Sequence, residues 1–203
     1  MPVKLFLASS NPGKLKEYRV LAEADAPASA SIELAPVPEF ASLTEFEENA
    51  PTFAENAAGK ALHYSRLLEG LVFADDSGLV VPSLGGAPGV HSARYAGVDA
   101  PNSKRIEKLL NEMRDKTGEQ RAAHFVCAIA LARQGRALAV VTGRVDGEIL
   151  GSTRGAGGFG YDPVFYFPPL KKTFAELSAE EKNGLSHRGK AFRKLLVALS
   201  SML

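Results

Sequence analysis

Short apolar runs separated by polar turns set the pattern of this chain and predict strands that alternate with helices. Runs with the length and composition of buried strands occupy residues 3–8, 32–37 and 71–74. Residues 124–131 and 137–145 are the longest strand candidates, and the glycine-containing turn between them predicts an antiparallel pair. This succession predicts an α/β fold with a mixed sheet.

Helical spacing of apolar residues follows several of these strands. Behind the first strand, the residues from Leu15 to Ala22 approximate a helical face, with Pro12 near the first helical position. Thr52 followed by Glu55 is a capping-box pattern, which predicts a helix from there to about Leu68. Two further helices are predicted by apolar residues that share one face: Ile106, Leu109, Leu110 and Met113, and then Leu195, Leu196 and Leu199.

The composition limits the classes of function. Residues 1–203 are enough for a single domain, which we expect to have two closely joined lobes and a shared core. Lys and Arg total 24 against 23 acids, a net charge of +1, so no broad surface for nucleic acid is indicated. Cys127 is the only cysteine and cannot form an intramolecular disulfide. No signal pattern and no apolar run of membrane-spanning length is present, which predicts a cytoplasmic protein without membrane contact.

Residues 9–14 have the sequence SSNPGK and connect the first strand to the first helix. Such a turn directs backbone N–H groups and the helix dipole at an anion, and Lys14 adds a charge that could reach phosphate oxygens. The spacing is not that of a Walker loop. Taken by itself, the segment is more typical of a turn that caps a helix.

Two adjacent aspartates, Asp75 and Asp76, follow the apolar run at 71–74. Ligands in open α/β sheets bind outside the carboxyl ends of strands, and two neighbouring carboxylates repel unless a cation such as Mg²⁺ offsets them. The alternative is a DDSG turn without a ligand. The two interpretations are evenly balanced on these residues alone.

Adjacent glutamates, Glu47 and Glu48, precede the helix that carries Glu55 and Lys60. They are typical of a solvated surface that favours the start of a helix. Glu55 has a sufficient role as the cap partner of Thr52, and Lys60 is equally typical of a surface lysine.

Residues 157–163 have the sequence GGFGYDP. Its glycines let the backbone approach a ligand, its aromatic rings could stack on a base, and Asp162 could accept from base N–H groups. Lys182 and the segment SHR at 186–188 place polar and cationic side chains before the last helix. A turn packed on the core and an exposed helix cap are the structural alternatives.

In their order along the chain and in their residues, these segments resemble the inosine triphosphate pyrophosphatase family, whose members hydrolyse abnormal purine nucleoside triphosphates. The matching segments are LASSNPGK (7–14), TFAENA (52–57), ADDSGL (74–79), GGAPGV (85–90), SARY (92–95), GGFGYDP (157–163) and SHRG (186–189). The resemblance implies hydrolysis of ITP, dITP and XTP to the monophosphate and pyrophosphate. It also implies an elongated mixed sheet flanked by helices, two lobes with the active site in a cleft between them, and a homodimer.

Carried over residue by residue, the resemblance assigns Asp76 as proton acceptor and, with Glu48, as a ligand of Mg²⁺. It implies substrate contacts from Ser9, Ser10, Asn11, Pro12, Gly13, Lys14, Lys60, Ser77, Phe159, Gly160, Tyr161, Asp162, Lys182, His187 and Arg188. Two positions depart from the family pattern. Ser10 replaces a usual Gly and could alter the phosphate-binding turn, whereas His91 replaces a common Tyr outside the assigned site.

The hydrogen-bonding edges of the purines suggest how the base is chosen. Hypoxanthine and xanthine carry an O6 acceptor and an N1–H donor, whereas adenine presents the reverse pair. A donor from His187 or Arg188 aimed at O6 would therefore disfavour adenine. Guanine shares O6, and the sequence does not indicate what would reject it.

Two other functions compete with this interpretation. A pyrophosphatase of the septum-formation inhibitor group would act on modified pyrimidine or ordinary nucleotides, but the segments at 159–162 and 186–188 argue against it. A non-catalytic nucleotide-binding module would need residues 9–14 and the aromatic loop without needing Glu48 and Asp76 together. The presence of both carboxylates favours the enzyme.

Overall fold

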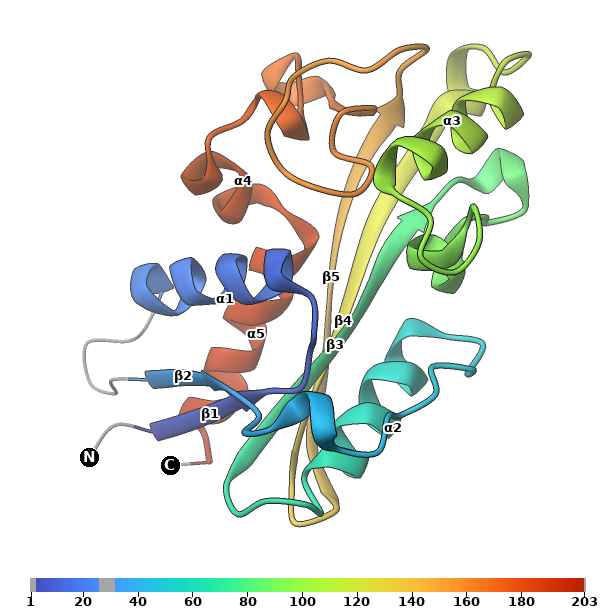
Figure 1. Ribbon diagram of the computed structural model, residues 1–203. Coiled ribbons are helices and arrows are strands. Elements are labelled where there is room, and N and C mark those ends of the chain that lie inside the picture. The colour runs from blue at the N-terminus through green and yellow to red at the C-terminus, as the bar shows by residue number, and fades with distance from the viewer. Residues whose placement is uncertain (1–2, 26–31, 203) are drawn as a thin grey trace. The chain divides into compact units, whose positions relative to one another are not determined.

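The computed structural model describes residues 3–25 and 32–202 and places seven strands of that part of the chain in one mixed sheet (Figure 1). The strands are β1 (Val3–Leu7), β2 (Ile32–Pro36), β3 (Leu71–Val80), β4 (Ala122–Arg133), β5 (Arg136–Ile149), β6 (Phe165–Phe167) and β7 (Lys172–Thr173). Their order is β2-β1-β3-β4-β5-β6-β7. β1 runs parallel to β2 and β3, whereas β6 is antiparallel to β5 and β7. The predicted α/β fold with a mixed sheet is confirmed.

Five α-helices lie in the described residues, and none of them has both the length and the apolar character needed to cross a membrane. They are α1 (Pro12–Asp25), α2 (Phe53–Tyr64), α3 (Asn102–Glu112), α4 (Ala179–Leu185) and α5 (His187–Ser200). Short 3-10 helices occupy Phe40–Ser42, Pro82–Leu84, Gly89–Arg94, Gly118–Arg121, Pro168–Leu170 and Phe174–Glu176.

The chain divides into two compact units. Unit 1 comprises residues 1–76, 127–143 and 187–203, and unit 2 comprises residues 77–126 and 144–186. Each has its own apolar core: Phe73, Phe192 and Tyr18 belong to that of unit 1, and Phe125 and Phe174 to that of unit 2. The expectation of a single domain with two lobes stays a prediction.

Strand residues of unit 1 alternate between two packed faces of the sheet, as the period of a β-strand requires. Phe73 and Cys127 lie in the core cluster that contains residues of α1 and α5, whereas Val72 and Ala74 lie in the cluster that contains Ala57 of α2. In Figure 1, α1 and α5 accordingly lie on one side of β3 and β4, and α2 lies on the other. Neighbouring residues of β3 therefore meet different helices.

Several local signals predict the elements correctly. Pro12 opens α1, and the Thr52 hydroxyl accepts the backbone N–H of Glu55 at the start of α2. Gln134 and Gly135 form the turn between β4 and β5 with φ of 49° and 73°, the left-handed pair that tight hairpins prefer. The periodicity does not predict β6 and β7, because three and two residues are too few to show a period.

The predicted end of the second helix near Leu68 is wrong, since α2 ends at Tyr64. The Ser65 hydroxyl donates to the Leu62 carbonyl at 3.1 Å and accepts the Gly135 N–H at 3.0 Å. A serine side chain engaged with backbone groups in this way competes with continuation of the helix.

The turn considered for residues 75–78 is also wrong, because β3 continues through them to Val80. β1 pairs with β3 only as far as Phe73, and β4 is the neighbour of β3 on its other side. The strand can therefore continue beside β4 after β1 has ended. Asp75 and Asp76 therefore lie beyond the carboxyl end of β1, where β3 no longer pairs with β1.

Close packing of α5 on β5 gives a test of this arrangement in unit 1. A Cβ added at Gly143 would overlap the His187 carbonyl oxygen and lie 2.6 Å from the Ala191 nitrogen. Because both are backbone atoms of α5, we expect Gly143→Ala to lower the free energy of unfolding by about 1–3 kcal/mol. Urea denaturation measures the loss. Gly151→Ala, whose Cβ would meet nothing within 4 Å, is the matched control and should change it by less than about 0.5 kcal/mol.

Candidate active site

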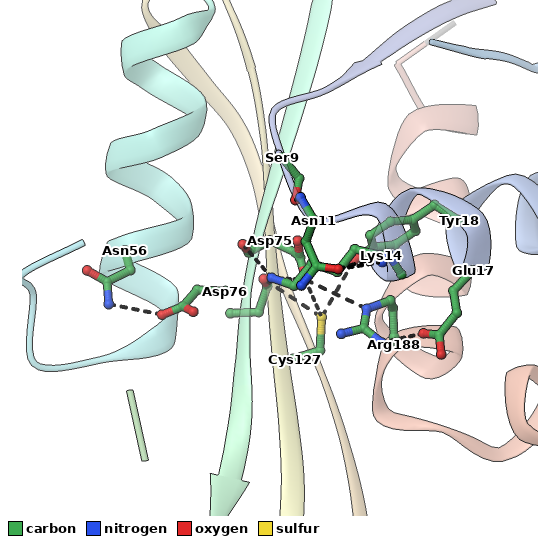
Figure 2. A network of polar contacts seen from close by, with 12 residues as sticks. Ser9, Asn11, Lys14, Glu17, Tyr18, Asn56, Asp75, Asp76, Cys127 and Arg188 are labelled. Carbon is green, nitrogen blue, oxygen red and sulfur yellow. Dashed lines mark hydrogen bonds and ion pairs between the residues drawn. The ribbon is translucent and has the colours of Figure 1, made fainter. Parts of the chain in front are cut away.

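Asp75 and Asp76 point to opposite faces of β3 and enter two different networks within unit 1. Figure 2 shows Asp75 directed towards Lys14 and Arg188, and Asp76 directed towards Asn56. Their alternation follows from their position inside a strand, where successive side chains face opposite sides. The two carboxylates therefore do not form one paired site.

Asp75 has no solvent exposure, and its charge is compensated by cations. Its Oδ2 lies 3.0 Å from Lys14 Nζ and 3.7 Å from Arg188 Nε. Burial by itself would raise the pKa of Asp75, but Lys14 and Arg188 outweigh it and hold that pKa below its ordinary value. Asp75 is therefore ionised at neutral pH and acts as the counter-ion of two cationic side chains.

Arg188, at the start of α5, is 2% exposed and binds two acids. Its Nη1 pairs with Glu17 of α1, in addition to the contact with Asp75. Burial opposes the charge, but Glu17, Tyr18 and Asp75 together raise the pKa of Arg188. The guanidinium of Arg188 thus connects α5 to Glu17 of α1 and to Asp75 of β3.

Asp76 lies on the face that meets α2, where it is 5% exposed. Its Oδ2 accepts a hydrogen bond from Asn56 Nδ2 at 2.9 Å. Burial and the charge of Glu48 raise the pKa of Asp76 to about 6, and the Asn56 hydrogen bond only partly opposes them. In contrast to Asp75, the charges of Lys14 and Lys60 do not outweigh burial and Glu48 at this carboxylate.

α2 also fixes the loop that carries Glu48. Phe46 N–H donates to the Tyr64 hydroxyl at 3.3 Å, and Asn56 Oδ1 accepts the Ala50 N–H at 2.9 Å. The Lys60 ammonium pairs with Glu48 directly. Asn56 and Lys60 are four residues apart and so lie on one face of α2, where each binds one of the two acids.

The two acids Glu48 and Asp76 fit a hard divalent cation. They come close enough for Glu48 to raise the pKa of Asp76, and a cation would relieve that repulsion. Among residues 3–25 and 32–202, no group of three or more His, Cys, Asp or Glu side chains could hold a metal. Two carboxylates suit Mg²⁺, which retains several waters and binds substrate phosphates as further ligands.

The turn from Ser9 to Lys14 begins α1 as predicted, and Asn11 caps the helix. Asn11 Oδ1 accepts the N–H groups of Gly13 at 2.9 Å and Lys14 at 3.2 Å. The Asn11 N–H also donates to Ser9 Oγ at 3.2 Å, so three backbone donors of the turn are engaged, and an anion there would bind the others or displace these bonds. Ser10 is not among the described non-glycine residues with positive φ, so its Cβ imposes no left-handed strain.

Unit 2 holds a second group of predicted residues, around Asp162. Its Oδ2 accepts from Lys182 Nζ at 2.6 Å and from the Phe159 N–H at 2.8 Å, and Lys182 Nζ lies 4.7 Å from the centre of the Phe159 ring. A Cβ at Gly158 would collide with this carboxylate, which explains the glycine. Tyr161 is buried and donates to the Ser92 carbonyl, so the half-buried Phe159 offers the better stacking face.

The predicted residues are thus divided between the two units. Unit 1 contains Ser9 to Lys14, Glu48, Lys60, Asp76, His187 and Arg188, and unit 2 contains Ser77, Phe159 to Asp162 and Lys182. Two further residues, Asn56 and Glu17, hold site residues and were not singled out by the sequence. Asn56 stands one turn before Lys60, and Glu17 stands three residues after Lys14, so each shares a helix face with a predicted site residue.

Comparison with known proteins decides the family. A model described as the Ham1 family matches residues 5–198. The chain belongs to the Ham1 family. This confirms the resemblance inferred from the sequence motifs, since relatives of this Ham1 chain are named dITP/XTP pyrophosphatases.

Similar proteins cover nearly all of this Ham1 chain. A dITP/XTP pyrophosphatase of Geobacillus kaustophilus is 50% identical over 192 residues, covering 95% of this chain and 92% of the relative. The structure of a HAM1 protein from Coxiella burnetii has a TM-score of 0.85 and 39% identity, covering 98% of this chain and 99% of that one. A nucleoside-triphosphatase structure from Mycobacterium abscessus, named dITP/XTP pyrophosphatase, has a TM-score of 0.75 and 37% identity, covering 96% and 99%.

The raised pKa of Asp76 predicts that this residue lowers stability at neutral pH. The folded protein holds a proton there more tightly than the unfolded chain, so ionisation costs folding free energy as pH rises from 3.8 to about 6. Asp76→Asn removes the charge and can still accept from Asn56. We expect the metal-free variant to be about 1–3 kcal/mol more stable than wild type at about pH 7.5, and nearly equal to it at about pH 4. Urea unfolding with a chelator at both pH values measures this, and an advantage independent of pH would contradict it.

Proposed function

We propose that this chain is a dITP/XTP pyrophosphatase, which hydrolyses ITP, dITP and XTP to the monophosphate and pyrophosphate. The observation that carries the proposal is the pair Glu48 and Asp76 held by one face of α2 in a Ham1-family chain. An acid whose pKa is raised by burial and by a second acid is suited to a metal-dependent phosphoanhydride hydrolase. The activity would remove abnormal purine nucleotides from the nucleotide pool.

Glu48 and Asp76 would hold Mg²⁺, which supplies charge neutralisation of the triphosphate and acidification of bound water. Asp76 would orient or deprotonate the water that attacks the α-phosphorus. The bond to the bridging oxygen then breaks, and pyrophosphate leaves. Asn56 supports this step because its amide holds the Asp76 carboxylate in one orientation.

The remaining predicted contacts divide by chemistry. Lys14, Lys60 and the backbone of residues 9–13 would bind phosphate oxygens, and the loop at 159–162 with Lys182 would contact the base. Asp162 supports this role because its carboxylate is already oriented by Lys182 and by a backbone N–H. Ser77, His187 and Arg188 complete the proposed substrate contacts.

Two features that the resemblance implies belong to the same proposal: a cleft between two lobes as the substrate site, and a homodimer. The cytoplasmic location expected from the sequence belongs to it as well. Sedimentation equilibrium of the purified chain tests the homodimer, because a single species of monomer mass at micromolar concentration would exclude it.

Pyrophosphate release with and without Mg²⁺ tests the reaction itself. With Mg²⁺ we expect release of pyrophosphate from dITP and XTP, well above that from dUTP and modified pyrimidine triphosphates. Asp76→Asn should lower kcat by about 10²–10⁴-fold while the Kd for nucleotide changes much less. A variant that loses binding and turnover equally, with turnover per bound complex intact, would contradict the role of Asp76. Equal rates with modified pyrimidine triphosphates would favour the septum-formation inhibitor type of enzyme.

Selection of the 6-oxo base gives a second test of the proposal. If Arg188 disfavours adenine, Arg188→Ala should lower the ratio of kcat/KM for ITP to that for ATP by about tenfold or more. Arg188 also neutralises Asp75, so the variant loses stability, but that loss affects both substrates and cancels in the ratio. Arg193→Ala on the same helix, which breaks an ion pair with Asp25, is the control. An unchanged ratio would leave Arg188 as a structural counter-ion.

A further inference from the structure

Lys60 neutralises the carboxylate of Glu48 in this structure. Its side chain is 9% exposed and its ammonium lies on Oε1 of Glu48, whose side chain is 31% exposed. Lys60 also lowers the pKa of Asp76 by its charge, although burial and Glu48 outweigh it. The ammonium therefore pairs with one of the two acids that would hold a divalent cation and acts on the other through its charge.

An ammonium and a divalent cation cannot share this carboxylate without a penalty. At contact distances the repulsion between their charges is large wherever solvent is partly excluded. A side chain with a four-carbon stem can move its charge by several ångströms without any change in the backbone. The backbone of α2 is held by the Thr52 cap and by buried Ala57 and Ala61, so any displacement falls on the Lys60 side chain.

We propose that Lys60 is an exchangeable counter-ion: it pairs with Glu48 in the metal-free protein and is released towards the triphosphate when Mg²⁺ takes Glu48. The inference rests on the proposed function, because it assumes that Glu48 and Asp76 form the metal pair. It adds an order to the binding events. Metal at Glu48 makes the Lys60 charge available to phosphate, so metal and phosphate reinforce one another through one side chain.

Binding of Mn²⁺ alone to the full chain, without nucleotide, tests the exchange. Electron paramagnetic resonance of free Mn²⁺ gives the Kd. Because Lys60→Gln removes the competing charge, we expect Mn²⁺ to bind about three- to tenfold more tightly than to wild type. Damage to the site would weaken binding, so the sign of the change separates exchange from a structural role. Lys60→Arg keeps the charge and should stay near the wild-type Kd.

Two controls show whether the effect runs through Glu48. Lys194→Gln removes a lysine of unit 1 that bonds the Thr142 carbonyl, and it should leave the Kd unchanged. In a Glu48→Gln background the gain from Lys60→Gln should disappear, since the shared carboxylate is absent. If Lys60→Gln still tightens Mn²⁺ binding by the same factor in the Glu48→Gln background, Lys60 acts through its charge without involving Glu48. That result would overturn the exchange.

The outcomes separate this inference from the proposed function. A folded Lys60→Gln protein, verified by circular dichroism, that binds Mn²⁺ no more tightly than wild type overturns the exchange alone. Failure of wild type to bind Mn²⁺ at millimolar concentration overturns the metal pair and the exchange together. Absence of dITP hydrolysis with tighter Mn²⁺ binding by Lys60→Gln overturns the proposed function and leaves the exchange supported.

Discussion

The carboxylate of Asp75, buried without solvent exposure, is the constraint on which unit 1 depends. An isolated charge in such a position would be strongly destabilising, so it has to be paired. Lys14 comes from α1 and Arg188 from α5, and Glu17 balances the second cation. One charge requirement therefore brings together the start of α1, the middle of β3 and the start of α5, which are remote in sequence.

The period of the strand divides the work between the two aspartates. Asp75 faces two cations, which hold its pKa low, whereas Asp76 faces Asn56 and Glu48, and its pKa is raised to about 6. Ionised Asp75 therefore raises the stability of the fold, whereas ionised Asp76 lowers it. Proteins commonly retain such a loss of stability where function requires a group with a perturbed pKa. The asymmetry supports Asp76 rather than Asp75 as the reactive acid.

Signals within a few residues made much of the fold predictable from the sequence. The remaining features depend on contacts between residues that are remote in sequence. Pro12, Thr52 and the 134–135 turn act within a few residues, so their elements are confirmed. The apolar pattern stops at Ala74 and so predicts that the strand ends there. It continues because β4 maintains the pairing while Lys14 and Asn56 satisfy the polar side chains. Glu17 resembles any exposed helix charge in sequence, and only the fold brings Arg188 to it.

The same reasoning distinguishes the two lysines proposed to bind phosphate. If Lys14 turns to a phosphate, Arg188 still faces Asp75, so the buried acid keeps a counter-ion. Release of Lys60 is different, because Glu48 and Asp76 already repel one another and lose a nearby positive charge when it leaves. A divalent cation at Glu48 more than replaces that charge. On the proposed mechanism, metal binding therefore precedes or accompanies the movement of Lys60, whereas Lys14 can move without it.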